Sequence, residues 1–152
     1  SSVFFFGIMI FTLYIFNRTG ACIYFYDWNR KKKHPFGSKE IEEELKLMGG
    51  LLYSIKQSVT TLSPQKSSDS MISYRTNKYK LHYLEVASGI RFAITSDLSC
   101  SDLKKELNLI YSTYFVDYVV KDPMYTQGDY ITNPHFVEGV DALVQKLPAF
   151  AS

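Results

Sequence analysis

The chain has 152 residues and a formal net charge of +2, and its composition is 46% hydrophobic and 21% charged. These values predict one globular domain with a sizeable core, and they exclude a disordered chain or a strongly basic nucleic-acid-binding protein. Aromatic residues make up 16% of the chain. We expect some of these rings to lie at an interface, because aromatic side chains combine a large contact area with few rotatable bonds.

The two cysteines, Cys22 and Cys100, lack the spacing of metal ligands and are too few for a disulfide framework. A reduced, cytosolic setting is the simplest interpretation. In that setting the match of Asn17-Arg18-Thr19 to the glycosylation pattern is expected to be fortuitous.

An apolar run, Val3–Phe16, opens the chain, and three interpretations compete for it. It is shorter than the about 20 residues of a membrane-spanning helix, and it lacks the preceding basic residues of a signal peptide. We therefore interpret Met9–Phe16 as a strand that is buried on both faces. Residues 1–8 are expected to be an N-terminal extension or added residues, and residues 9–152 a single domain.

A polar turn with Gly20 leads to Ala21–Tyr26, the expected second strand of a hairpin. The loop that follows contains four consecutive basic residues, Arg30, Lys31, Lys32 and Lys33. It is either a solvated loop or a contact for anionic lipid or for an acidic protein surface.

The longest periodic pattern lies in Lys39–Leu62 and predicts an amphipathic helix. Its apolar residues recur at steps of three and four: Ile41, Leu45, Met48, Leu52, Ile55, Val59 and Leu62. Acidic residues at its beginning suit a helix N-terminus, and Ser63-Pro64 ends it. The pair Gly49-Gly50 costs about 1 kcal/mol per residue relative to alanine. It indicates either close packing against the sheet or a surface on which another protein docks.

Three strands are expected next, because apolar and polar residues alternate between turn signals. They are Met71–Thr76, Tyr79–Val86 and Ile90–Thr95. A helix over about Asp102–Val120 follows, with Ser101 as its N-cap, and a last helix begins at Pro134 and ends before Pro148. The second helix has an expected apolar face of Leu103, Leu107, Ile110, Tyr111, Tyr114, Phe115 and Tyr118.

The element order β-β-α-β-β-β-α-α predicts an α/β (α+β) fold. Both helical regions have apolar faces, so we expect a five-stranded sheet with one helix on one face and two on the other.

Enzyme motifs are not found in the sequence: it has no G-x-S-x-G elbow, phosphate loop or G-x-G-x-x-G. The histidines, His34, His82 and His135, share no motif, and the helix dipole and solubility explain the glutamates of Glu40–Glu44. We predict no catalytic residue, no metal site and no cofactor. An apolar and aromatic chain of this kind indicates a binding function.

Segments in a fixed order carry a family resemblance. They are Tyr14–Arg18 with Gly20, Cys22 and Trp28, then Glu43–Gly50 with Ser54–Lys56, Thr76, Tyr79–Tyr83, Gly89, Ser96-Asp97 and Ile110–Val116. This set resembles the small subunits of the TRAPP vesicle-tethering complex. Two positions depart from the family pattern. Asn17 stands where an aspartate is common, and Gly49 stands where an aromatic residue commonly precedes the glycine, which puts in doubt any neighbour contact that used that ring.

The resemblance implies a longin-like (SNARE-like) fold and a cytosolic subunit that acts peripherally at endoplasmic reticulum and cis-Golgi membranes. In that family, longin-type and Bet-three-type subunits assemble into a complex that tethers vesicles and promotes nucleotide exchange on a Rab GTPase, with no catalytic residue in this subunit. The predicted contacts for a neighbouring subunit are Gly49, Gly50, Leu51 and Tyr53. The predicted contacts for the Rab are Thr76, Tyr79, His82, Ser96 and Asp97, because strand ends and turns commonly carry binding groups.

Two alternatives remain open. Small subunits of clathrin-adaptor and coat complexes share the apolar strand, the polar turn with glycine and the strand that leads to a tryptophan. However, Thr76–His82, Ser96-Asp97 and Ile110–Ser112 resemble TRAPP and not the coat subunits. A peripheral membrane enzyme or anchor would instead use Val3–Phe16 and Arg30–Lys33 to hold a membrane. No nucleic-acid partner is expected.

Overall fold

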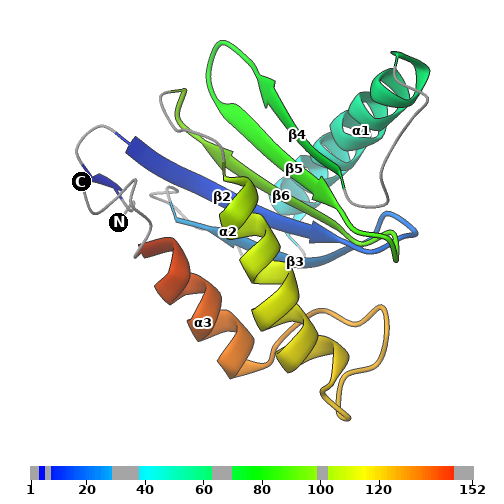
Figure 1. Ribbon diagram of the computed structural model, residues 1–152, viewed down its shortest axis with the longest axis vertical. Coiled ribbons are helices and arrows are strands. Elements are labelled where there is room, and N and C mark those ends of the chain that lie inside the picture. Colours follow the sequence, from blue (N-terminus) through cyan, green and yellow to red (C-terminus); the bar gives the residue numbers. More distant parts are fainter. Residues whose placement is uncertain (1–3, 6–7, 29–37, 63–69, 99–102, 146–152) are drawn as a thin grey trace.

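The computed structural model describes residues 4–5, 8–28, 38–62, 70–98 and 103–145. These residues form an antiparallel sheet with helices on both faces, as Figure 1 shows. The strands are β1 (Phe4–Phe5), β2 (Ile8–Phe16), β3 (Cys22–Asp27), β4 (Ser70–Arg75), β5 (Lys80–Glu85) and β6 (Arg91–Ser96). The five longer strands lie in the order β3-β2-β6-β5-β4, so the predicted five-stranded sheet is confirmed.

Strand β1 is an addition to the predicted order. Phe4 pairs with Met9 and Phe5 pairs with Ile8, so a part of the expected N-terminal extension is joined to the beginning of β2. The sequence pattern did not reveal β1, because two residues inside a continuous apolar run give no periodicity.

Strand β2 lies between β3 and β6 and is buried on both faces, as its apolar run predicted. Leu13 and Ile15 point to the core on one side of the sheet, and Tyr14 and Phe16 point to the core on the other side. Successive side chains of β2 therefore enter the two cores in turn, so a substitution in this strand affects one core or the other according to its position.

Helix α1 (Lys39–Leu62) covers one face of the sheet. The predicted apolar side of this helix is confirmed for Ile41, Leu45, Met48, Leu52 and Ile55, which are buried against Phe16, Leu81 and Tyr83, whereas the side chains of Val59 and Leu62 lie outside the described part. The helix begins after Ser38, whose Oγ accepts a hydrogen bond from the Ile41 N–H at 3.4 Å.

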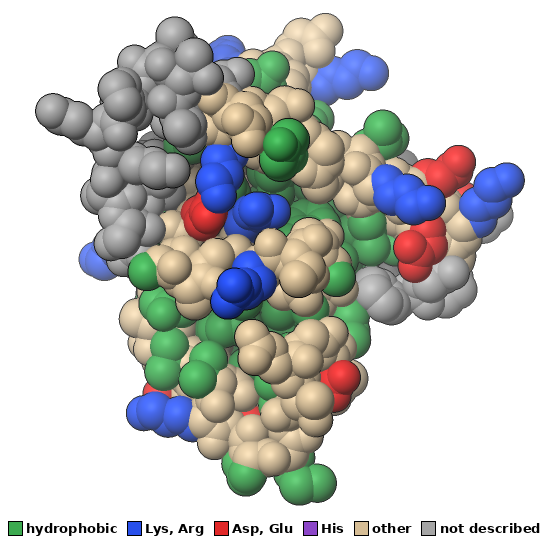
Figure 2. Space-filling view, turned by 90° about the vertical axis from the view of Figure 1, so that its right-hand side faces the viewer, with side chains coloured by type: hydrophobic (Ala, Val, Ile, Leu, Met, Phe, Trp, Pro, Cys, Tyr) green, Lys and Arg blue, Asp and Glu red, His purple; other side chains and the backbone are tan. Residues whose placement is uncertain are grey.

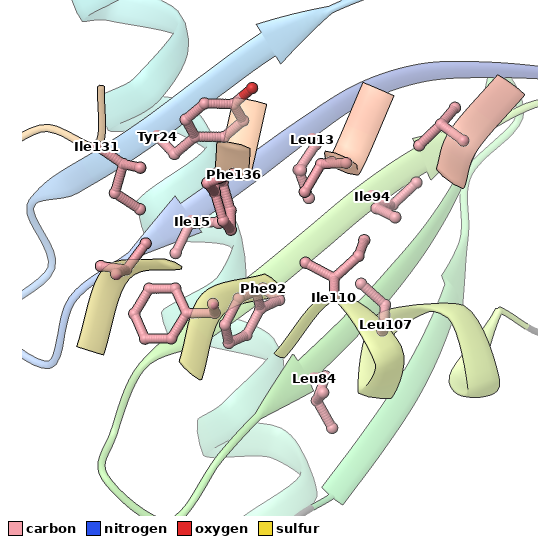
Figure 3. Close-up of a cluster of buried hydrophobic side chains, with 14 of the residues drawn as sticks. Leu13, Ile15, Tyr24, Leu84, Phe92, Ile94, Leu107, Ile110, Ile131 and Phe136 are labelled. Carbon is pink, nitrogen blue, oxygen red and sulfur yellow. The ribbon is translucent and has the colours of Figure 1, made fainter. Parts of the chain in front are cut away.

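Three helical segments cover the opposite face: α2 (Lys104–Leu109), η1 (Ile110–Val120) and α3 (Pro134–Gln145). Their apolar residues pack on the sheet around Leu13, Phe92 and Phe136 (Figure 3). Trp28, at the end of β3, is tied to α3 because its Nε1–H donates to Asp141 Oδ1 at 2.7 Å. The prediction of one helix on one face and two on the other is confirmed, since α2 and η1 are continuous (Figure 1).

The second helix differs from the prediction in its turns. It begins at Lys104, with Leu103 at the N-cap position, and the proposed cap Ser101 lies outside the described residues. From Ile110 onward it is a π-helix, with wider turns; at its end the Lys121 N–H donates to the Val116 carbonyl, five residues earlier. The buried residues are therefore Ile110, Phe115 and Val119, whereas Tyr111, Tyr114 and Tyr118, which the α-helical spacing predicted on the same face, are half-buried.

Two turns meet at one end of the sheet. In the β2–β3 turn, Asn17 Oδ1 accepts hydrogen bonds from the N–H groups of Thr19 and Ala21, so asparagine supplies here the acceptor oxygen that an aspartate would offer. In the β5–β6 turn, Gly89 has a φ of +92°, and a Cβ there would lie 2.9 Å from Cβ of Arg18. The glycine thus permits both the turn and the close approach of the two hairpins.

Candidate interaction surface on helix α1

Helix α1 borders two hollows. The first, here called the acidic hollow, has a volume of about 720 Å³ and lies between the first half of α1 and one end of the sheet. Its lining includes the carboxylates of Asp27, Glu40, Glu43 and Glu44 and the apolar side chains of Leu47, Met48 and Leu51. Leu47 is 77% exposed. A surface that combines exposed apolar atoms with charge of one sign is typical of a protein-binding site.

Tyr14 links the sheet to α1 at the acidic hollow. Its hydroxyl donates to Glu44 Oε2 at 2.9 Å, from strand β2 to helix α1. Burial and the negative charge of Glu44 raise the pKa of Tyr14, so the phenol stays protonated and keeps donating. The sheet and the helix are thereby held together at this point.

The second hollow, here called the basic hollow, has a volume of about 420 Å³ and lies beside the glycine pair of α1. Gly49, Gly50 and Tyr53 line it. Its charged lining residues are all cations, namely Arg18, Lys46 and Arg91. Tyr53 is 58% exposed, so an aromatic ring is available on this surface.

The glycine pair is not explained by packing inside the described part of the chain. A Cβ on Gly49 would lie 3.9 Å from Phe16 Cε1, an ordinary van der Waals distance, and a Cβ on Gly50 would meet no atom within 4 Å. Close packing against the sheet therefore does not account for Gly50. The other interpretation, a surface on which another protein docks, is still physically reasonable. Because glycine has no side chain, the backbone of a second protein can come close to α1 at this pair.

Ion pairing fixes the far half of α1 on the sheet. Lys56 Nζ lies 2.9 Å from Glu85 Oε2 on β5, and the Tyr83 hydroxyl donates to Glu85 Oε1 at 3.0 Å. Arg91 Nε is 3.9 Å from the same Oε1. These contacts set the orientation of α1, and so of the two hollows.

The residues predicted to contact a Rab lie in two different environments. Thr76, Tyr79, Ser96 and Asp97 lie at the ends of β4, β5 and β6, whereas His82 lies inside β5. Thr76 builds the β4–β5 turn: its Oγ1 donates to the Tyr79 carbonyl at 3.0 Å and accepts from the Tyr79 N–H at 3.0 Å. Tyr79 is half-buried and lines the acidic hollow. Asp97 is half-buried, just beyond β6.

The prediction that His82 and Ser96 contact a Rab is wrong for their side chains, because both residues are fully buried, with exposed fractions of 0%. His82 Nε2 and Ser96 Oγ lie 2.9 Å apart, and Ser96 Oγ donates to the Asp97 carbonyl at 3.1 Å. Buried in this way, their side chains cannot touch a partner. They join β5 to β6 and hold the backbone at Asp97 instead.

The sequence analysis missed Leu47 and the carboxylates around it as parts of a surface. The signal was present, since Leu47 is a leucine off the apolar side of the helix, and three of the glutamates line the same hollow. The basic residues Arg30, Lys31, Lys32 and Lys33 lie outside the described residues.

Within the described ranges, every helix is too short or too polar to cross a membrane. In the same part of the chain, no group of three or more His, Cys, Asp or Glu side chains is arranged to hold a metal ion.

Comparison with known proteins agrees with the fold. The sequence matches the Sybindin-like family over residues 10–147, and the chain belongs to this family. The fold is of the longin-like α+β type. Among its relatives, it is 42% identical over 146 residues to trafficking protein particle complex subunit 1 of Dictyostelium discoideum, which covers 95% of this chain and 100% of that protein.

Similarity extends to animals and yeast. The chain is 36% identical over 143 residues to the human protein with the same subunit name, covering 94% of this chain and 97% of the relative. It is 29% identical over 133 residues to trafficking protein particle complex subunit BET5 of Saccharomyces cerevisiae, covering 86% and 83%.

Proposed function

We propose that this chain is a core subunit of a trafficking protein particle (TRAPP) complex, and that it acts by binding rather than by catalysis. The observation that carries this proposal is the 42% identity to a subunit of that name over the full length of that relative. A similarity without gaps in coverage supports the same role in an assembly, because the surfaces that neighbours use are spread over the whole domain.

The α1 surface is the proposed contact for a neighbouring small subunit. Gly50 and Tyr53 offer a bare stretch of backbone beside an exposed ring, and Leu47 and Leu51 add apolar area on the acidic side. The two hollows have opposite charge. A neighbour with the complementary arrangement of charges would therefore bind in one orientation only, because like charges oppose the reversed one.

The end of the sheet at Thr76, Tyr79 and Asp97 is the proposed contribution to a nucleotide-exchange surface for a Rab GTPase, with His82 and Ser96 as positioning residues. Exchange of this kind needs no reactive group, since it follows from tighter binding of the nucleotide-free GTPase than of the nucleotide-bound form. We place the assembly on the cytoplasmic side of endoplasmic reticulum and cis-Golgi membranes, in transport between them. The basic run Arg30–Lys33 is a proposed contact with anionic lipid.

Purification of the tagged full-length chain from native cells, followed by mass spectrometry, tests the assembly. Recovery of the other TRAPP small subunits supports the proposal. Recovery of the large chain of a clathrin adaptor in their place would contradict it and support the coat-subunit alternative.

Replacement of Asp97 by lysine tests the exchange surface. In the reconstituted complex we expect Asp97→Lys to slow nucleotide release from the Rab while the complex elutes unchanged from a sizing column. Lys105→Glu, a charge reversal at an exposed position of α2, is the control and should leave exchange unchanged. Unaltered exchange with Asp97→Lys would show that this end of the sheet does not touch the GTPase.

A further inference from the structure

A third cavity lies against η1 on the other face of the sheet and shares one lining residue, Arg18, with the basic hollow. It has a volume of about 460 Å³ and is enclosed by η1, the β2–β3 and β5–β6 turns and the loop that follows η1. Figure 2 looks onto this end of the molecule, where hydrophobic side chains are visible in a hollow with Lys or Arg side chains above it. Here it is called the η1 cavity.

The walls of the η1 cavity are apolar, and its charge is of one sign. Ile23, Ile90, Tyr111, Phe115 and Val119 supply apolar wall, and Asn17, Ser88 and Gln127 add polar groups. Among the described residues that line it, Arg18 is the one charged side chain. A cation beside an apolar recess suits a ligand that has an apolar group next to a carboxylate, because a guanidinium pairs with a carboxylate through two parallel hydrogen bonds.

Apolar exposure continues past the mouth of the cavity. Val120, on its rim, is 62% exposed, and Met124, in the loop after η1, is 87% exposed. A small molecule held inside the cavity would contact Val120 but leave Met124, which does not line it, in water. A polypeptide that inserts one side chain would cover Met124 as well, so the surroundings of the cavity favour a protein segment over a small ligand.

Two carboxylates of η1 and the loop after it are already engaged. Asp117 pairs with Lys121 across one turn, with Nζ and Oδ1 3.5 Å apart. Asp122 holds the loop, because its Oδ1 accepts from the Met124 N–H and its Oδ2 accepts from Asn133 Nδ2. Neither of these carboxylates pairs with Arg18 in the described part of the chain.

The main wall of the cavity is the π-helix. Tyr111, Phe115 and Val119, spaced four residues apart on this helix, all line the cavity. π-helical turns are uncommon and are frequent at functional sites. The π-helical wall therefore agrees with a binding role for the cavity.

We propose that the η1 cavity binds a segment of a partner protein in which an apolar side chain enters the recess and a neighbouring carboxylate pairs with Arg18. This assignment goes beyond the role of α1 proposed above. The two sites share Arg18, which lines both the basic hollow and the η1 cavity, whereas the apolar wall of the η1 cavity belongs to it and not to the hollows of α1.

The test uses the full-length chain and a fluorescein-labelled hexapeptide that alternates leucine or phenylalanine with glutamate, followed by fluorescence polarisation. Two matched peptides carry lysine for glutamate, or serine for the apolar residues. We expect saturable binding of the first peptide and at least tenfold weaker binding of the other two. Arg18→Glu and Val120→Asp should each weaken binding of the first peptide at least tenfold.

Lys46→Glu is the control variant, because it makes the same charge change in the basic hollow but does not line the η1 cavity. It should alter binding by less than twofold. Thermal unfolding checks that each variant is folded, and Arg18→Gln, which keeps a polar side chain, replaces Arg18→Glu if that variant fails to fold. The proposal is overturned if the glutamate and lysine peptides bind with equal affinity, or if Lys46→Glu weakens binding as much as Arg18→Glu does. It is also overturned if the Arg18 variants and Val120→Asp bind the first peptide with wild-type affinity. Binding of decanoate without binding of the peptide would overturn it as well.

Discussion

Replacement of Gly50 by alanine should stabilise the isolated chain and weaken its assembly. The residue lies inside α1 and is exposed, and within the described part of the chain no atom lies within 4 Å of the position that a Cβ would take. The full helix-propensity difference of about 1 kcal/mol should therefore appear as added stability, without a steric penalty. For a domain of this size that gain corresponds to a rise of about 2–4 °C in Tm.

Two measurements on the same variant separate the roles of Gly50. Urea denaturation of the isolated chain, followed by the fluorescence of its single tryptophan, gives the stability change. Sedimentation of the reconstituted complex gives the affinity for the neighbouring subunit, which we expect to fall at least tenfold if a second backbone lies against the bare helix. A loss of stability in the isolated chain would refute the steric argument, and unchanged affinity would refute the docking argument. Ser54→Ala, at an exposed position one turn further along α1, is the matched control.

Three further predictions concern the cores and one thiol. Gly139→Ala should lower the free energy of unfolding, measured by urea denaturation, by about 1–3 kcal/mol. A Cβ at this position would lie 2.5 Å from Tyr114 Cε1, so Tyr114, and η1 with it, would have to move from α3. A gain in stability would mean that the tyrosine side chain moves freely. Asp141→Ala should cost about 1–3 kcal/mol, since it leaves the buried Trp28 Nε1–H without its acceptor, whereas Asp141→Asn, which retains an oxygen, should recover most of the loss. Burial raises the pKa of Cys22 from 9.0 to about 11. In a Cys100→Ser background, iodoacetamide at pH 8 should therefore modify the folded chain about 100-fold more slowly than the unfolded chain. The Cys22 thiol loses its proton at a lower pH in the unfolded chain than in the folded chain. Its contribution to the free energy of unfolding is therefore present below pH 9 and should be lost as the pH rises toward 11, which denaturation at a series of pH values would measure. Equal alkylation rates of the folded and unfolded chains would show that the thiol is not buried.

The distribution of apolar residues in the sequence was enough to predict β2 and α1, the strand from a continuous apolar run and the helix from periodicity. A strand that is paired along both edges and covered on both faces needs apolar side chains in both directions, and the unbroken apolar run of β2 meets that need. The apolar side of α1 keeps its spacing from Ile41 to Ile55 because that helix is regular. The fold class followed from the order of such elements.

The π-helix could not be predicted in this way. Ile110, Tyr111, Tyr114 and Phe115 fit an α-helical face in the sequence. In the structure Phe115 lies in the core between Phe92 and Phe136, whereas the tyrosines lie at its margin. The same limit applies to the two residues wrongly assigned to a surface. Alternation along a strand covered on both faces does not reveal that His82 is buried, because its polar partner, Ser96, comes from a neighbouring strand.

The loop after η1 determines where this sheet can grow. Ile131 donates its N–H to the Ile23 carbonyl at 2.7 Å, and the Tyr130 hydroxyl accepts from the Phe25 N–H and donates to the Phe25 carbonyl, each at 3.1 Å. The outer margin of β3 is thus already occupied by the chain itself. An incoming strand from another molecule therefore cannot pair with β3 along this stretch, and end-to-end stacking of identical copies through that edge is blocked.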